Sequence, residues 1–470
     1  MNTYFIRTFG CQMNKHDAER VAGLLEAEGM DSADDPEAAD AIVFMTCCVR
    51  DNADNRFFGQ LSSLRELKTR KPEVLIAVGG CIGQRDGLSI VDRFEHVDVV
   101  FGTHNVGRLP HLLDMASFSV NPVVEVLQSS DDFASDLPAR REHSYHAWVP
   151  IATGCDNHCA YCIVPAVRGN EKSRTEASIL REIERLLQDG VMEVTLLGQN
   201  VNSWGRDLYG APRFHVLLDK ISQMGVPRVR FTTSHPKDLS NNTIEAMAST
   251  DAICNALHLP VQSGSNQVLG AMNRGYTSEQ YLDVVHRLYE RIPGLALSTD
   301  VIVGFPGETD SDFQATLDLV ETCRFDQAFS FMYSPREGTP AYGIDNQIPR
   351  EVMQERFDAL IPVIHSSALT KNKELIETNQ LVLVEGRSRR DPLMLSGRTE
   401  GNKVVHAPLS DTLSIEDMVG KLAEVLISDA RTWHLTGRII STEPVSTSSV
   451  DSSINASAAD RTLDSPFNRS

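Results

Sequence analysis

Short apolar runs alternate with helical patterns along the first part of the chain. Four of these runs have the length of buried strands, at residues 4–8, 41–45, 74–78 and 97–101. Stretches at residues 17–28 and 56–68 instead carry apolar side chains every three or four positions, as one face of a helix does. Strands joined by crossover helices form a parallel sheet that is covered on both sides. The pattern therefore predicts a doubly wound α/β domain over residues 1–117.

A second alternation of strands and helices follows a polar stretch at residues 118–146, which we interpret as a linker. Six further apolar runs are candidate strands, at residues 147–152, 191–197, 229–233, 256–261, 295–303 and 327–333. Six strand–helix units are two fewer than a closed (β/α)8 barrel requires. The pattern predicts an open, partial (β/α)6 barrel over residues 147–375, with its active site at the carboxyl ends of the strands.

The last part of the chain has a different pattern. A charged helical stretch at residues 350–378 leads to short strands separated by glycines, at residues 381–385, 403–407 and 421–427. Such a pattern is typical of a small five-stranded β-barrel, here over residues 376–440, of the kind that binds oligonucleotides. Residues 441–470 are rich in Ser and Thr and poor in apolar side chains, so they are predicted to form a disordered tail.

Composition narrows the class of protein. The 470 residues are 41% hydrophobic, which is enough for several cores. The net charge of −20 argues mildly against a nucleic-acid partner, although a local basic patch can serve on an acidic protein. No apolar run is long enough to cross a membrane, and the first ten residues lack the features of a secretion signal. We therefore expect a cytoplasmic protein without membrane contact, in which the nine cysteines are ligands, catalytic groups or buried apolar residues rather than disulfides.

Cys155, Cys159 and Cys162, called here the triplet, follow the first predicted strand of the barrel. Three thiolates on one loop can bind three irons of a cubane cluster and leave the fourth iron open to a ligand. The alternative is a zinc ion bound by His158 together with the cysteines, although zinc sites usually take paired ligands from separate loops. The spacing favours a [4Fe–4S] cluster with an open position.

Cys11, Cys47 and Cys81, called here the strand-end cysteines, each follow a predicted strand of the N-terminal sheet. Parallel strands end at one edge of a sheet, where ligands bind, so the three thiols should converge. Packing is the alternative for any one of them, but the shared offset and the neighbouring glycines favour a second cluster. The remaining cysteines are interpreted as structural or as buried apolar residues: Cys48, Cys254 and Cys323.

Ordered motifs surround both groups of cysteines. They are Phe9-Gly10-Cys11-Gln12-Met13-Asn14, Thr46-Cys47, Gly79-Gly80-Cys81, Ile163-Val164-Pro165, Arg168-Gly169, Leu197-Gly198-Gln199-Asn200, His258-Leu259-Pro260-Val261-Gln262-Ser263-Gly264-Ser265 and Val303-Gly304-Phe305-Pro306-Gly307-Glu308. On these motifs the chain, over about residues 1–440, resembles the methylthiotransferase family of radical S-adenosylmethionine (SAM) enzymes.

The resemblance implies a fold and cofactors. The central part would be a radical SAM barrel, the C-terminal barrel would be a TRAM-like RNA-binding domain, and the N-terminal domain would be the methylthiotransferase domain. Two [4Fe–4S] clusters and SAM would be bound, with no catalytic residue beyond the cluster ligands. Tyr161 would lie beside the adenine of SAM, and Gln199, Gln262 and Asp300 would contact the cofactor. The alternative for each of these side chains is an ordinary aromatic or polar group at the barrel mouth.

The resemblance also implies an activity. Gln12-Met13-Asn14 and Leu259-Pro260-Val261-Gln262 resemble the branch that acts on tRNA carrying N6-dimethylallyladenosine 3′ of the anticodon. One SAM would methylate sulfur at the N-terminal cluster, and another would yield the radical that removes hydrogen from carbon 2 of the base. The implied partners are tRNA, an electron donor of flavodoxin or ferredoxin type and iron–sulfur assembly proteins, and the protein would be a monomer.

The sequence is also compatible with other functions. The same chemistry could act on threonylcarbamoyl-adenosine in tRNA or on an aspartate of a ribosomal protein, and a protein of another class could bind RNA and iron–sulfur clusters without catalysis. In the C-terminal barrel, His406 and Trp433 are candidates to stack on bases. The candidate phosphate contacts are Arg387, Arg389, Arg390, Arg398 and Lys403.

Overall fold

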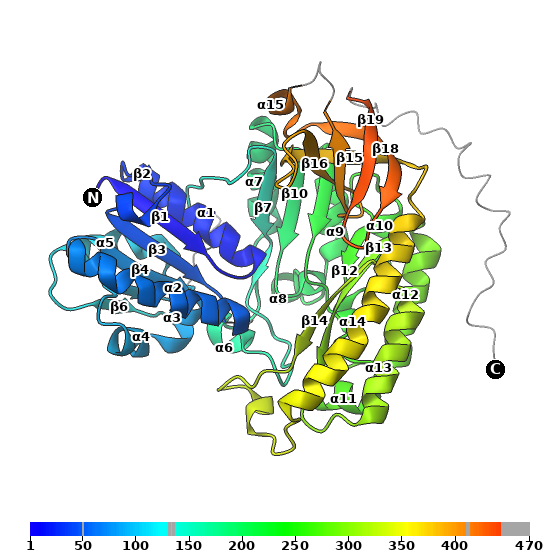
Figure 1. Cartoon of the computed structure of the whole chain (residues 1–470), viewed down its shortest axis with the longest axis horizontal. Helices are drawn as coiled ribbons and strands as arrows, with labels where there is room; N and C mark the ends of the chain where they lie inside the picture. The colour runs from blue at the N-terminus through cyan, green and yellow to red at the C-terminus, as the bar shows by residue number, and fades with distance from the viewer. Residues whose placement is uncertain (49–50, 130–132, 134–136, 410–413, 443–470) are drawn as a thin grey trace.

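The computed structural model of the chain describes residues 1–48, 51–129, 133, 137–409 and 414–442. They form an N-terminal α/β domain, a central open barrel and a small C-terminal barrel (Figure 1). These architectures and their order confirm the fold predicted from the sequence. The predicted tail lies, beyond residue 442, outside the described residues. Among the described helices, none combines the length and apolar composition that a bilayer span requires.

The N-terminal sheet is parallel throughout, with the strand order β2-β1-β3-β4-β5-β6. Its strands are β1 (Thr3–Thr8), β2 (Asp31–Ser32), β3 (Ala41–Thr46), β4 (Leu75–Gly80), β5 (Val99–Phe101) and β6 (Val123–Glu125). One face is covered by α1 (Gln12–Ala27) and α5 (Leu109–Ser117), and the other by α2 (Asp51–Arg70), α3 (Cys81–Asp86) and α4 (Leu88–Arg93). The sequence pattern missed β2 and β6 because such short strands carry almost no periodicity; β6 lies within the stretch predicted as a linker.

The central barrel consists of two three-stranded parallel sheets, β7-β10-β11 and β12-β13-β14, bridged where Val229 pairs with Ile253. The strands are β7 (His146–Pro150), β10 (Glu193–Leu197), β11 (Arg228–Phe231), β12 (Ala256–His258), β13 (Ala296–Val303) and β14 (Gln327–Met332), with a short hairpin of β8 (Ala152–Thr153) and β9 (Lys172–Ser173). The helices are α6 (Val164–Arg168), α7 (Glu176–Gln188), α8 (Arg206–Tyr209), α9 (Phe214–Ser222), α10 (Asn241–Ala248), α11 (Asn266–Ala271), α12 (Ser278–Arg291), α13 (Asp310–Cys323) and α14 (Arg350–Lys373). Because β7 and β14 are edge strands, the barrel is open, as predicted.

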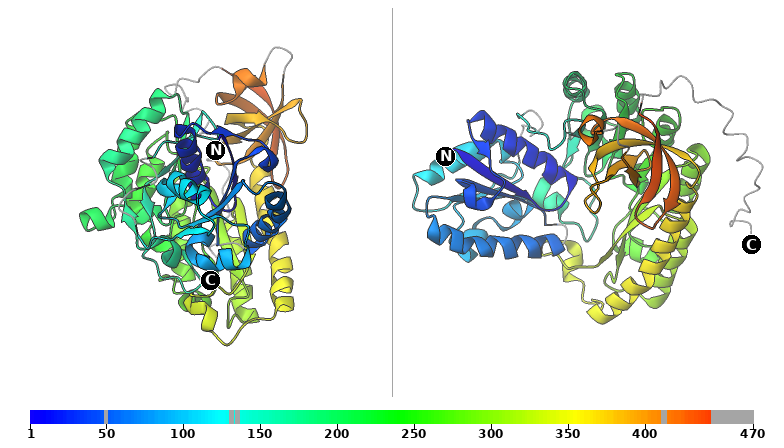
Figure 2. Two further views of the ribbon diagram at one scale, coloured as in Figure 1. Left: turned by 90° about the vertical axis from the view of Figure 1, so that its left-hand side faces the viewer. Right: turned by 45° about the horizontal axis from the view of Figure 1, so that its top comes forward.

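The C-terminal barrel is closed in the order β15-β16-β17-β19-β18. Its elements are β15 (Asn379–Arg387), β16 (Met394–Thr399), β17 (Val404–Pro408), α15 (Ile415–Met418), β18 (Leu422–Ala430) and β19 (Leu435–Ser441). It sits at the amino ends of the central strands, whereas α6 lies at their carboxyl ends (Figures 1 and 2).

Three cations hold the C-terminal barrel in place. Arg228 and Arg230 of β11 donate hydrogen bonds to the backbone carbonyls of residues 398–400. Lys403 forms an ion pair of 2.6 Å with Asp326, which precedes β14. Lys403 is therefore a docking residue rather than the phosphate contact that the sequence suggested.

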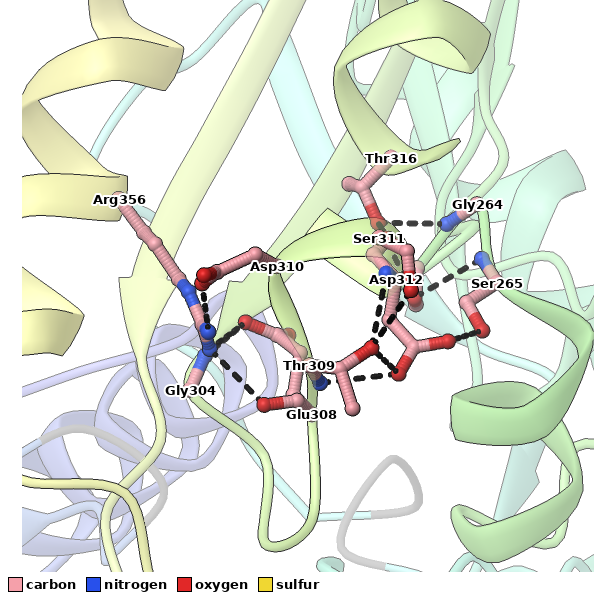
Figure 3. Close-up of polar contacts among 11 residues, drawn as sticks. Gly264, Ser265, Gly304, Glu308, Thr309, Asp310, Ser311, Asp312, Thr316 and Arg356 are labelled. Carbon is pink, nitrogen blue, oxygen red and sulfur yellow. Dashed lines mark hydrogen bonds and ion pairs between the residues drawn. The ribbon is translucent and has the colours of Figure 1, made fainter. Parts of the chain in front are cut away.

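A buried ion pair fixes the loop after β13 (Figure 3). The Glu308 carboxylate accepts hydrogen bonds from the backbone N–H of Gly304 (3.0 Å) and from Nη1 of Arg356 in α14 (2.8 Å). The side chains of Arg356 and Glu308 are only 8% and 1% exposed. The glutamate of this motif is therefore a structural residue that shapes the carboxyl end of β13.

The loop after β12 is fixed in a similar way against α13 (Figure 3). The N–H of Gly264 donates to Thr316 Oγ1 at 3.0 Å, and the Ser265 hydroxyl donates to Asp312. A Cβ on Gly264 would lie 2.3 Å from the backbone oxygen of Ala315, so only glycine fits there. Both motif loops at the barrel mouth are thus held by packing that is independent of any ligand.

We expect Arg356→Ala to lower the stability of the central barrel by about 3–5 kcal/mol, because the Glu308 carboxylate stays buried without its partner. Urea unfolding followed by circular dichroism measures the change. Arg291→Ala is the matched control, since Arg291 pairs with Glu245 on the surface and its loss should have little effect. Equal stability of the two variants would contradict the structural role of the buried pair.

Candidate metal centres

The strand-end cysteines lie at one edge of the N-terminal sheet. Cys11 precedes α1 after β1, Cys47 follows β3, and Cys81 begins α3 directly after β4. These three strands are neighbours in the sheet. Gly10 has a φ of 107°, and a Cβ at this position would lie 2.1 Å from the Cβ of Cys47. A glycine here lets the two cysteine loops approach closely.

Two side chains tie these loops together. Asn14 of α1 donates hydrogen bonds to the backbone oxygens of Phe9 (3.0 Å) and Thr46 (2.7 Å), which precede Cys11 and Cys47. Arg168 reaches across from α6 and donates to Asn14 Oδ1 (2.9 Å) and Asp17 Oδ2 (3.1 Å). The loop that carries the triplet is thereby connected to the strand-end cysteines.

The surroundings favour the thiolate form of two strand-end cysteines. A hydrogen bond from Cys47 and the nearby Arg168 guanidinium lower the pKa of Cys11 to about 6. A hydrogen bond from Cys48, again with help from Arg168, lowers the pKa of Cys81. Since the thiolate is the form that binds metals, the site suits iron ligation. Cys48, interpreted from the sequence as structural, thus contacts a candidate ligand directly.

The triplet occupies the loop between β8 and α6 at the other half of the site. The N–H of Cys155 donates to the backbone oxygen of Gly169 at 3.1 Å, and the N–H of Cys162 donates to that of Cys159 at 3.0 Å. Gly154 has a φ of 72°, and a Cβ there would lie 2.0 Å from the backbone oxygen of Asn170. The loop therefore folds back on the segment that follows it and keeps the cysteines on one short stretch of chain.

A buried arginine contacts the triplet. Arg274 donates from Nη1 to Cys159 Sγ (3.4 Å) and to the Tyr161 hydroxyl (3.3 Å). Burial raises the pKa of Cys155 to about 11 and that of Cys162 to about 12. These thiols therefore stay protonated until a metal displaces the protons, and a guanidinium in contact then offsets part of the new negative charge.

The zinc alternative requires His158 as a ligand together with the triplet cysteines. His158 is exposed while the neighbouring Cys155 and Cys159 are buried. Within the residues that the structure describes, no three Cys, His, Asp or Glu side chains converge closely enough to hold one metal ion. Zinc holds its sulfur ligands at about 2.3 Å and so requires tight convergence, whereas a cubane cluster takes each thiolate on a different iron. The exposure of His158 therefore argues against its role as a ligand beside the triplet cysteines.

Two of the predicted cofactor contacts, Gln199 and Gln262, follow central strands, and Asp300 lies within one. Gln199 lies two residues beyond β10, and Asp300 lies in β13, with Oδ2 at 3.5 Å from His258 Nε2. Gln262 has a φ of 72°, its N–H donates to the Asp300 backbone oxygen (2.9 Å), and its buried Oε1 has no hydrogen-bond partner. An unpaired buried amide oxygen is costly unless a ligand pairs with it. Tyr161 packs on the apolar cluster around Phe305.

Sequence reasoning missed the roles of Arg168 and Arg274. Arg168 was part of a recognised motif, but nothing in its neighbourhood indicated contact with residues about 150 positions earlier in the chain. Arg274 follows a short helix, α11, and carries no periodic signal. The only signal in the sequence for either arginine is a charged residue next to apolar segments. This signal by itself is weak evidence that the arginine is buried.

Three family descriptions match the chain. The radical SAM superfamily matches residues 149–320, the uncharacterized protein family UPF0004 matches residues 3–102, and the TRAM domain matches residues 375–440. Among solved structures, the radical S-adenosylmethionine methyltransferase TsrM from Kitasatospora setae, with cobalamin and a [4Fe–4S] cluster bound, superposes with a TM-score of 0.52. It is 16% identical and covers 73% of this chain and 77% of its own, so the likeness shows the fold alone.

Relatives of much higher identity share one description, tRNA-2-methylthio-N(6)-dimethylallyladenosine synthase. The protein from Carboxydothermus hydrogenoformans is 46% identical over 441 residues, which are 93% of this chain and 99% of the relative. The protein from Corynebacterium urealyticum is 47% identical over 443 residues, 92% of this chain and 81% of the relative. The chain belongs to the family of tRNA-2-methylthio-N(6)-dimethylallyladenosine synthases, within the radical SAM superfamily.

Proposed function

We propose that this protein transfers a methylthio group to carbon 2 of N6-dimethylallyladenosine in tRNA, at the adenosine 3′ of the anticodon. The observation that carries the proposal is the presence of two separate groups of three cysteines at the carboxyl ends of two parallel sheets. The family supports the choice of substrate. A hydrogen on an aromatic carbon is beyond the reach of ordinary acid–base side chains, which explains the need for radical chemistry.

The two groups of cysteines would hold two [4Fe–4S] clusters, each with one iron left open. When bound, the cluster on the triplet supplies the electron that cleaves SAM, and the cluster on the strand-end cysteines supplies the sulfur. The ligands of the first are Cys155, Cys159 and Cys162, and those of the second are Cys11, Cys47 and Cys81.

The protein's own side chains position the reactants. SAM would be contacted at the mouth of the barrel by Tyr161, Gln199, Gln262 and Asp300. The buried Oε1 of Gln262, which has no hydrogen-bond partner within the protein, could accept a hydrogen bond from SAM. Arg274 holds the triplet loop through Cys159 and Tyr161. Two cysteines of each group are buried, namely Cys47 and Cys81 in one and Cys155 and Cys159 in the other. Their burial limits access of water, which would strengthen these polar contacts and protect a reactive radical.

The C-terminal barrel is the proposed site of tRNA contact away from the reacting base. A cavity of about 790 Å³ between α14 and the barrel is lined by Arg390, His406, Arg431, Trp433 and His434, among others. The Trp433 ring is about half exposed and stacks edge-on against His365. Exposed aromatic rings flanked by arginines suit an unstacked base and its phosphate.

The remaining partners follow from the chemistry. Reduction of the triplet cluster requires an electron donor, for which a flavodoxin or ferredoxin is the expected class, and assembly of both clusters requires iron–sulfur assembly proteins. We propose a monomer that acts in the cytoplasm.

Nucleoside mass spectrometry on tRNA from cells with and without the gene tests the proposed function. Loss of the gene should remove 2-methylthio-N6-dimethylallyladenosine and leave N6-dimethylallyladenosine in its place. An unchanged signal for 2-methylthio-N6-dimethylallyladenosine would reject this substrate. Loss of methylthiolated threonylcarbamoyl-adenosine from the same tRNA would instead identify that nucleoside as the substrate.

Substitution of single cysteines should separate the two halves of the reaction. Cys155→Ala should abolish cleavage of SAM to 5′-deoxyadenosine by the dithionite-reduced protein, because the open iron is lost with the triplet cluster. Cys11→Ala should retain cleavage and lose sulfur insertion. Anaerobic assays with chromatographic detection of 5′-deoxyadenosine and of the modified nucleoside measure both steps.

Cys323→Ala is the matched control, because Cys323 is a buried cysteine, as Cys155 is, but belongs to neither group and should keep both steps. Loss of SAM cleavage in Cys11→Ala would contradict the division of labour between the two groups. An intact protein with both clusters that never cleaves SAM would favour a non-catalytic RNA-binding role.

A further inference from the structure

The inner face of the central sheet carries side chains that are only partly buried. Along β13, Ser298, Asp300 and Ile302 are half-buried, whereas the residues between them are buried against the outer helices. The same alternation appears in β12, where His258 faces inward. A closed barrel would pack these positions, but the open barrel leaves them accessible.

Phe329 is a large apolar side chain left exposed on this face. Among the exposed large hydrophobic residues of the described chain, it alone lies on a strand of the central sheet, and it is 39% exposed. Its neighbour Ala328 packs in the core below the helices, so the alternation of the strand turns Phe329 inward. Exposure of a phenylalanine inside a barrel leaves apolar surface that an apolar ligand group could cover.

The position of Phe329 places it beside the predicted cofactor contacts. Phe329 is paired in register with Asp300 of β13, and the Asp300 backbone accepts the hydrogen bond from Gln262. The His258 ring lies 6.0 Å from the Phe329 ring at 74°, an edge-to-face contact that orients the phenylalanine. His258 also pairs with Asp300. The apolar ring of Phe329 and the polar His258–Asp300 pair therefore lie side by side, next to the predicted cofactor contacts.

The geometry points to Phe329 as the residue that recognises the dimethylallyl group of the substrate. This inference rests on the proposed function. The dimethylallyl group is a branched, apolar five-carbon substituent at N6. The ring carbon that carries N6, carbon 6, is separated from carbon 2 by N1 alone. A group attached so near the reacting carbon must lie close to SAM. The Phe329 ring offers the apolar wall, and the His258–Asp300 pair lies where the polar edge of adenine would follow.

Two anticodon stem-loop RNAs that differ only in the dimethylallyl group test this inference. Their dissociation constants are measured with the full-length, cluster-reconstituted protein, the variants Phe329→Ala and Phe329→Leu, and the control Phe118→Ala, which removes an exposed ring from the N-terminal domain. Iron content and thermal midpoint establish that each protein is folded. Phe329→Leu keeps an apolar side chain at this position, so it still tests the inference if the alanine variant misfolds.

The parent protein should prefer the dimethylallyl RNA, and Phe329→Ala should reduce this preference about 10- to 100-fold, with the affinity for the plain RNA unchanged. Phe329→Leu should lie between the two, and Phe118→Ala should keep the full preference. Full preference in both Phe329 variants would overturn the inference while leaving the proposed function intact. A parent protein that makes no methylthio product from dimethylallyl tRNA would overturn the proposed function and the inference with it.

Discussion

A buried chain of charges holds the two halves of the candidate site in one arrangement. Arg168 of the central part pairs with Asp17 of α1, and one turn further along this helix Arg20 contacts Glu182 of α7 at 2.5 Å. Glu182 is also bound by Arg174 at 2.6 Å. Removal of one member would leave a buried charge without its partner, which is strongly destabilising. The separation between the strand-end cysteines and the triplet therefore depends on these contacts.

The same arrangement determines how a substrate can reach the site. The C-terminal barrel is docked at the amino ends of the central strands, and the triplet lies at their carboxyl ends. The eight residues of β13 span about 26 Å at 3.3 Å per residue. An RNA held at the C-terminal barrel must extend at least this far along the protein to place one base beside both cysteine groups. A stem that presents a loop at its end has the required shape.

Local sequence pattern predicted most of the fold and the candidate ligands. Strands such as β13 and helices such as α7 carry clear periodicity, and the cysteines are identified by their place after strands. The sequence did not reveal the contacts of Arg168 and Arg274, the docking of Lys403 against Asp326 or the contact of Cys48 with Cys81. All of these contacts join segments far apart in the chain, and no spacing rule encodes them.

The proposed chemistry requires that two groups of three thiolates each hold a four-iron cluster with one open position. Iron and sulfide quantitation with Mössbauer spectroscopy on the anaerobically reconstituted protein measures this occupancy. We expect about eight irons and eight sulfides per chain, all in [4Fe–4S] signatures. About half this content, or zinc in place of iron, would contradict it and remove the source of the transferred sulfur.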